Sequence, residues 1–131
     1  MPYTATSLAR FKRSAFTEDA DRMLRQSSGI DVNSVNQLVE LVERNRAEEC
    51  LYRVICELSH NPKSHGDAGS KFAQSLLKFR QSKHPKVKFY LDAMTNGAKA
   101  KSNEQCRMHY PRCSHSTTEI ISVGNRIFKT G

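Results

Sequence analysis

The stretch that decides the fold is residues 35–58, VNQLVELVERNRAEECLYRVICEL. Its apolar residues recur close to the 3.6-residue period of an amphipathic helix, at Val35, Leu38, Val39, Val42, Ala47, Leu51, Val54, Ile55 and Leu58. The pattern predicts one long central helix. We expect it to end before Pro62, because a residue that precedes proline is pushed out of the α region.

The same stretch carries two of the four cysteines, Cys50 and Cys56. Positions six apart on a helix lie about 9 Å apart along the axis, whereas a disulfide needs Cα atoms within about 7 Å. The two cysteines therefore cannot bond to each other, and their oxidised partners must be Cys106 and Cys113. Of the two crossing patterns we favour the antiparallel one, Cys50–Cys113 with Cys56–Cys106, although spacing alone leaves the other pattern open.

A metal site is the alternative use of the second cysteine pair. In the segment CRMHYPRCSH, Cys106, His109, Cys113 and His115 offer nitrogen and sulfur ligands of the soft kind. The spacings C-x5-C and C-x6-C, however, match no strong zinc-finger pattern. Structural disulfides are therefore the preferred interpretation, and no metal or other cofactor is expected.

Two helix boundaries are expected before the central helix. Thr17 offers an N-cap with acids behind it, for a short helix that stops at the SSG of residues 27–29. Asp31 or Asn33 then caps the central helix. The sixteen residues ahead of Thr17 show little periodicity and are expected to form a flexible leader.

Three more helical segments follow the turn-rich loop of residues 61–66. The third helix starts at Asp67 or Ser70 and ends near Ser82, and its apolar stripe consists of Phe72, Leu76, Leu77 and Phe79. The fourth has Pro85 in its first turn and residues 96–97, Asn-Gly, as its C-cap.

A short helical turn is expected around Cys106, and the sequence STTE of residues 116–119 is a capping box that opens a final helix. No strand pattern competes with these segments. The prediction is an all-α fold, a small bundle of about five helices around a long central helix, linked by two disulfides. It comprises a leader at residues 1–16 and a single domain at residues 17–131.

A processing motif lies inside the leader. Arg10, Lys12 and Arg13 spell R-x-K-R, the form cut by dibasic proteases of the secretory pathway, and cleavage after Arg13 would leave Ser14 as the mature N-terminus. Residues 1–13 lack the apolar block of a signal peptide. The chain is therefore expected either to stay in the cytosol or to begin at a Met1 added after a signal was removed.

The net charge of +8 is concentrated in the middle of the chain. Residues 63–112 hold eleven Lys and Arg against three Asp and Glu, whereas residues 1–62 hold eight against nine. Such a basic face suits acidic macromolecules or an extracellular matrix protein, although a solvated helical face is the simpler explanation. The predicted polyanion-binding residues are Lys78, Arg80, Lys83, Lys86 and Lys88.

Other function classes find little in the sequence. It contains no G-x-S-x-G, no Gly-rich phosphate loop and no H-E-x-x-H, so an enzyme is not expected. No run of about 18 apolar residues is present, so no membrane span is expected. Phe79, Phe89 and Tyr90 fall at helical spacing and are interpreted as core rather than as base-stacking platforms, so specific nucleic-acid binding is not expected.

The two cysteine motifs resemble a known family. Residues 50–57, CLYRVICE, contain C-x-x-R-x-x-C-E with Arg53 and Glu57, and a later cysteine, Cys106, precedes Y-P-x-C at residues 110–113. This pattern is similar to the arthropod DM4/DM12 type of small secreted four-cysteine protein. The resemblance covers roughly residues 34–115. It implies a secreted arthropod protein and brings no enzymatic activity with it.

The resulting expectation is a secreted, non-enzymatic helical protein that is a structural or binding component of an extracellular material of the silk, cuticle or eggshell type. The first alternative is a soluble extracellular carrier or signalling factor for an apolar ligand or a receptor. A carrier should enclose an apolar cavity of a few hundred Å³, whereas a matrix component should have a filled core. The third possible function is that of a cytosolic polyanion-binding protein, which requires reduced thiols.

Overall fold

The structure, a computed structural model, describes residues 15–26 and 34–130. Within these ranges the chain forms seven helices and no strand: α2 (Ala15–Gln26), α3 (Ser34–Arg44), α4 (Glu48–His60), α5 (Gly66–Gln81), α6 (Val87–Lys99), α7 (Asn103–His109) and α8 (Thr117–Thr130). The prediction of an all-α fold is confirmed, although the described residues contain seven helices where about five were expected. None of these helices is long and apolar enough to cross a membrane.

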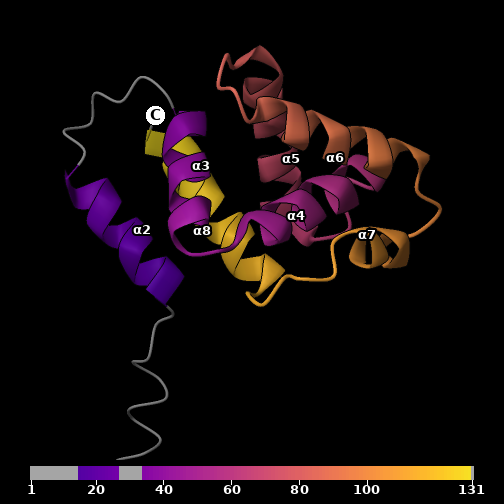
Figure 1. The fold of residues 1–131 in the computed structure, drawn as a ribbon, viewed down its shortest axis with the longest axis horizontal. Helices are drawn as coiled ribbons and strands as arrows, with labels where there is room; N and C mark the ends of the chain where they lie inside the picture. Colours follow the sequence, from indigo (N-terminus) through magenta and orange to yellow (C-terminus); the bar gives the residue numbers. More distant parts are fainter. Residues whose placement is uncertain (1–14, 27–33, 131) are drawn as a thin grey trace, which may run out of the picture.

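Helix α4 is the element around which the others pack. It contacts α3, α5, α6, α7 and α8, and its most extensive contact is with α6. In Figure 1, α2, α3 and α8 gather on the left, α4 crosses the centre, and α6 and α7 lie to the right. Helix α2 packs on α3 and α8.

The predicted long central helix is in fact two helices, α3 and α4. The Arg46 backbone has φ 54°, in the left-handed region, and the Ala47 N–H donates to the Val42 carbonyl at 2.8 Å while the Arg46 N–H donates to that of Glu43 at 3.2 Å. These two bonds form a Schellman motif, which ends α3 and redirects the chain. Arg46 occupies the position where glycine is usual, so the sequence carried no glycine signal for the break.

Several helix ends differ from those predicted. Helix α2 begins at Ala15, two residues before the predicted N-cap, so Thr17 lies inside the helix, and Phe16 is fully buried. Helix α5 begins at Gly66 and ends at Gln81, close to the predicted limits. Helix α6 begins at Val87, after Pro85 rather than at it. The predicted stop at residues 27–29 and the caps at Asp31 and Asn33 lie outside the described residues.

The predicted C-cap at residues 96–97 is wrong, because α6 continues to Lys99. Gly97 is buried inside that helix, and a Cβ built on it would lie 2.2 Å from the Cys56 carbonyl oxygen. Gly97 is thus the point at which α6 approaches the α4 backbone closely. Only a residue without a side chain fits such an approach.

The remaining predictions of helix ends agree with the structure. Helix α4 ends at His60, before Pro62, and a short helix, α7, surrounds Cys106. The Ser116 hydroxyl accepts a hydrogen bond from the Glu119 N–H at 3.3 Å, at the start of α8. The Ser116 side chain therefore caps α8 as the capping box predicts.

The core is aliphatic and aromatic and runs through every long helix. Its largest fully buried side chains come from α2, α3, α4, α5, α6 and α8. They are Phe16, Leu38, Val39, Leu41, Leu51, Ile55, Leu58, Phe72, Phe79, Tyr90, Ile120 and Ile127. Most of the apolar positions of residues 35–58 are in this core, as their periodicity predicted.

Candidate functional site

Two disulfides join α4 to the segment that follows α6. Cys50 bonds to Cys113 with Cα atoms 4.6 Å apart, and Cys56 bonds to Cys106 with Cα atoms 5.7 Å apart. This is the antiparallel pairing that the sequence analysis favoured. Because the sulfurs of Cys106 and Cys113 are both in disulfides, they are not available as thiolate ligands for a metal. The described residues contain no cluster of three or more His, Cys, Asp or Glu residues that suits a metal.

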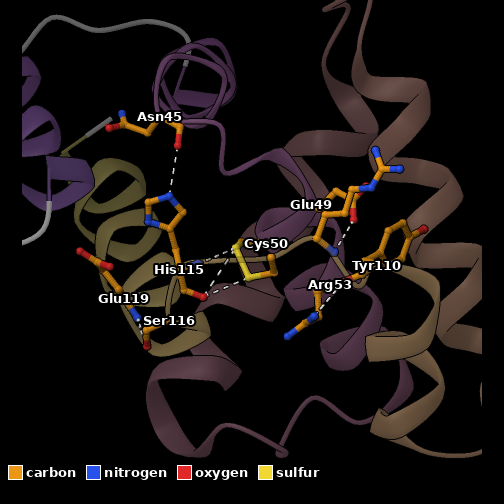
Figure 2. The surroundings of a disulfide bond; sticks show 10 residues. Asn45, Glu49, Cys50, Arg53, Tyr110, His115, Ser116 and Glu119 are labelled. Atoms are coloured by element: carbon orange, nitrogen blue, oxygen red, sulfur yellow. Dashed lines mark hydrogen bonds between the residues drawn. A yellow bond between two sulfur atoms is a disulfide. The ribbon is translucent and has the colours of Figure 1, made fainter.

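The arginine of the first cysteine motif holds the backbone of the second. Arg53 donates from Nε and Nη2 to the Tyr110 carbonyl oxygen at 3.2 and 2.8 Å (Figure 2). Glu49, one turn earlier on α4, accepts from the Arg112 N–H at 3.0 Å. The Asn96 side-chain amide donates to the Tyr110 hydroxyl at 2.8 Å, which adds α6 to the same junction. The motif residues thus fasten the Y-P-x-C loop to α4.

His115 connects the first disulfide to the end of α3. Its backbone N–H donates to the Cys50 sulfur at 3.4 Å, and its Nε2 lies 3.1 Å from the Asn45 carbonyl oxygen (Figure 2). Because a carbonyl only accepts, Nε2 must carry the proton. The ring centroid of Phe16 on α2 lies 5.7 Å from that of His115. Sequence reasoning placed His115 among candidate metal ligands, and its observed contacts are structural.

The glutamate of the first motif is buried beside the second disulfide. Glu57 is 3% exposed, and its carboxylate lies 2.5 Å from His65 Nε2 and 4.0 Å from Arg107 Nε. A buried carboxylate needs such partners to offset its lost hydration. Glu57 therefore links α4 to the residue before α5 and to α7.

Burial raises the pKa of two tyrosines next to this junction. The pKa of Tyr52 rises to about 12, because burial and then the negative charges of Glu48 and Glu43 disfavour the phenolate. The pKa of Tyr90 is also raised, mainly by burial. The ring of Tyr52 packs 5.2 Å from that of Tyr90 and 5.6 Å from that of Tyr110. The phenols of Tyr52 and Tyr90 are therefore neutral packing groups at physiological pH.

The predicted polyanion-binding residues are all exposed and lie in the last turn of α5, the first turn of α6 and the connection between these two helices. Three of them also contact other side chains. Lys86 pairs with Glu43 of α3, and the hydrogen bond it donates to that carboxylate raises its pKa. Lys78 Nζ lies 5.2 Å from the centre of the Phe128 ring, and Lys88 Nζ lies 5.3 Å from that of Phe89. The charges therefore point toward different neighbours rather than along one stripe.

The aromatic residues among these cations have different surroundings. Phe79 and Tyr90 are fully buried, as their interpretation as core residues predicts. Phe89 is 43% exposed, so its interpretation as a core residue is wrong. It lines a surface hollow of about 360 Å³ together with Tyr52, Lys86 and Arg112.

Four hollows on the described surface are open to solvent. They have volumes of about 350 to 510 Å³, and none of the four is an enclosed chamber in the core. A groove between α5 and α6 is lined mostly by apolar side chains, among them Leu77. Leu77 was predicted as part of the apolar stripe of its helix, but it is 56% exposed.

The predicted processing residues Arg10, Lys12 and Arg13 lie outside the described residues. Their cleavage stays a prediction.

The pattern of cysteines and their partners agrees with a comparison of the chain with protein families. Residues 33–113 match the model of the DM4/DM12 family, so the chain belongs to that family. The match covers both disulfides, Arg53, Glu57 and Tyr110, and it leaves out α2 and α8. No curated protein and no solved structure matches the chain.

Proposed function

We propose that this chain is a secreted, non-enzymatic helical protein that serves as a structural or binding component of an extracellular material, of the silk, cuticle or eggshell type. The observation that carries the proposal is the closure of all four cysteines as two disulfides. Structural disulfides form and persist in oxidising compartments, whereas cytosolic thiols are kept reduced. The cytosolic alternative requires reduced thiols, so this observation counts against it.

The openness of the four hollows supports a surface-binding role over a carrier role. A carrier of an apolar ligand needs an enclosed pocket that buries most of the ligand. The hollows described above are open, and the large side chains of the core pack against each other. The binding surface that we propose is the basic end, formed by Lys78, Arg80, Lys83, Lys86 and Lys88, and its partners are acidic macromolecules of the matrix.

The binding part of the proposal is tested on a heparin column and on immobilised poly-glutamate. We expect the oxidised chain to be retained and to elute at lower salt when the five cations are replaced by Ala, since exposed charges act over about 8–10 Å. The matched control replaces five other exposed cations by Ala, for the same change in net charge: Arg25, Lys63, Lys71, Lys99 and Lys101. Equal shifts for both variants would mean that only net charge matters, and would contradict a binding site at the basic end.

Lys86 needs a separate variant, because its replacement also removes the partner of Glu43. A quadruple variant that replaces the other four cations and keeps Lys86 should retain the wild-type melting temperature and still elute at lower salt than the wild type.

The secreted assignment is tested by the mass of the protein from its natural source. We expect a mass lower by the hydrogens of two disulfides and an N-terminus at Ser14. Four free thiols would overturn the assignment.

A further inference from the structure

The groove between α5 and α6 is an open surface lined mostly by apolar side chains. It has a volume of about 350 Å³, its floor includes Leu58 of α4, and its walls include Ala73, Leu76 and Leu77 of α5 and Met94 and Ala98 of α6. Leu58, Leu76 and Met94 are less than one-tenth exposed, so they belong to the core. The groove is therefore an exposed edge of the core.

Leu77 is the side chain that makes this edge unusual. It is one of three large apolar residues exposed on the described surface, with Phe89 and Met108, and it is the one that lines the groove. A single exposed leucine is ordinary on a protein surface. An exposed leucine continuous with an apolar groove is typical of an interaction site.

The charge around the groove selects the kind of partner. Arg80 is the one charged residue of the groove lining, and no Asp or Glu lines it. Two neighbouring cations contact other parts of the molecule, since Lys78 lies over the Phe128 ring and Lys86 pairs with Glu43. A partner that lays an apolar face into the groove would therefore meet positive charge at Arg80, which favours an acidic residue at that edge.

The length of the groove suits a short helix. Its lining on α5 runs from Ala73 to Arg80, which is about 10 Å along the helix axis. Two turns of a second helix cover that length, and residues at i, i+3 or i+4, and i+7 would supply its anchors. Helices pack at about 8–10 Å between axes when they interlock in this way.

We propose that this groove docks an acidic amphipathic helix of the partner, with apolar anchors on Leu77 and the groove and with a Glu or Asp flank facing Arg80. The proposal rests on the proposed function, since it names the part of the acidic partner that the domain recognises. The basic end supplies long-range attraction, and the groove supplies selection for an amphipathic pattern.

The test uses a synthetic acidic peptide of about 14 residues, or four helical turns, with Leu at helical spacing and Glu elsewhere. Its binding to the oxidised full chain is measured by fluorescence anisotropy. Two control peptides are a scrambled version of the same composition and a version with Lys in place of Glu. We expect the amphipathic acidic peptide to bind at least tenfold more tightly than either control.

Variants of the chain locate the binding. Leu77→Gln should weaken it about tenfold, the size expected when a buried apolar anchor is lost. Arg80→Gln should weaken it a few-fold and reduce its dependence on salt. Met108→Gln, at an exposed site that does not line the groove, should leave it unchanged. Both Leu77→Gln and Met108→Gln replace exposed helical residues, and unchanged melting curves would show that the fold is kept.

Three outcomes would overturn the proposal. One is equal binding of the scrambled peptide, and another is unchanged binding by Leu77→Gln. The third is a dimer in analytical ultracentrifugation that Leu77→Gln abolishes, since this would make a second copy of the chain the occupant. If the peptide does not bind while heparin retention still depends on the five cations, the groove proposal is wrong and the proposed function is unaffected. Loss of that dependence would instead overturn the proposed function.

Discussion

The segment that matches the family, residues 33–113, is held together by different interactions from those that attach the two helices outside it, α2 and α8. The matched segment contains both disulfides, the contact of Arg53 with the Tyr110 carbonyl, and the buried Glu57. Helices α2 and α8 carry no cysteine. They are attached by apolar packing, through residues such as Phe16 and Ile127, and by ion pairs at the surface.

The ion pairs show how α2 is oriented. Asp19 pairs with Arg44 of α3 at 2.6 Å, and Asp21 pairs with Arg126 of α8 at 2.6 Å. Both acids are largely buried, but each arginine is 43% exposed, and ion pairs that reach solvent in this way contribute modestly to stability and are screened by salt. The arrangement of the matched segment is thus covalently constrained, whereas the position of α2 depends on weaker forces. Mutations in the two parts should differ in size accordingly.

The largest effect is expected from loss of a disulfide. In the chain-entropy model, the loops closed by Cys50–Cys113 and Cys56–Cys106 each contribute about 4 kcal/mol to the free energy of unfolding. Replacing both members of either pair by Ala should lower the melting temperature by about 15 °C. A chelator should have no effect, and a chelator-induced loss of the fold in a thermal scan would contradict the disulfide interpretation.

Substitutions at two glycines allow a direct comparison, because Gly97 lies in the matched segment and Gly124 lies outside it, in α8. Alanine at Gly97 places its Cβ 2.2 Å from the Cys56 carbonyl, so α4 and α6 must move apart where a disulfide also holds α4. Alanine at Gly124 of α8 meets the Phe72 ring at 2.5 Å, and a side chain can turn aside. Overpacking costs about 1–3 kcal/mol. In urea unfolding, we expect Gly97→Ala to lower the free energy of unfolding by about 3 kcal/mol or more, and Gly124→Ala to lower it by about 1 kcal/mol. The reverse order would contradict the greater constraint on the matched segment.

Arg53→Ala should have a smaller effect within the matched segment. It removes both hydrogen bonds to the Tyr110 carbonyl oxygen and leaves a partly buried acceptor without them. The expected cost is about 1–2 kcal/mol. The control is Arg112→Ala, since that side chain is exposed and the hydrogen bond of this residue to Glu49 comes from its backbone N–H. Equal effects of the two variants in chemical denaturation would show that the Arg53 contact adds little.

The contact between α2 and α3 should show a dependence on pH. Although burial raises the pKa of Asp19, hydrogen bonds from Arg44 and Asn45 outweigh it and lower that pKa below its usual value. A depressed folded pKa gives stability that is present above the unfolded pKa of about 4 and is lost as pH falls through the folded pKa. Its size is about 1 kcal/mol or less, because Arg44 is 43% exposed.

Asp19→Asn tests this dependence. The variant should be less stable than the wild type at pH 6, and the difference should shrink between pH 4 and pH 2. Glu40→Gln removes the other, more exposed partner of Arg44 and serves as the control. A constant difference between Asp19→Asn and wild type across this range, measured by denaturant unfolding, would show that the charge of Asp19 does not attach α2.

Much of the fold could be predicted from sequence because its signals are local. The apolar period of residues 35–58 identified core positions such as Leu38 and Leu51, and Ser116 identified the start of α8. The cysteine pairs could be matched across segments because a helix separates Cys50 from Cys56. Each of these predictions depends on residues close together in the chain or on one geometric limit.

What could not be predicted depends on the approach of distant segments. Gly97 was interpreted as a helix end, because the position of the Cys56 carbonyl against it is not visible in the sequence. The exposure of Leu77 has the same origin, since periodicity shows an apolar stripe but not where the neighbouring helix stops covering it. His115 also gave no signal of its contact with Asn45, seventy residues away.

The break between α3 and α4 had no signal in the sequence. It leads to the prediction with the smallest expected effect on stability. Arg46 holds φ 54° at the position after α3 where glycine is usual. A non-glycine residue pays about 1–2 kcal/mol there, and glycine loses about 0.5–1 kcal/mol more in conformational entropy on folding. Arg46→Gly should therefore stabilise the protein by about 0.5 kcal/mol. Arg112→Gly, at an exposed position outside the left-handed region, should not be stabilising. If urea unfolding shows that Arg46→Gly is destabilising, the Arg46 side chain itself stabilises the junction between α3 and α4.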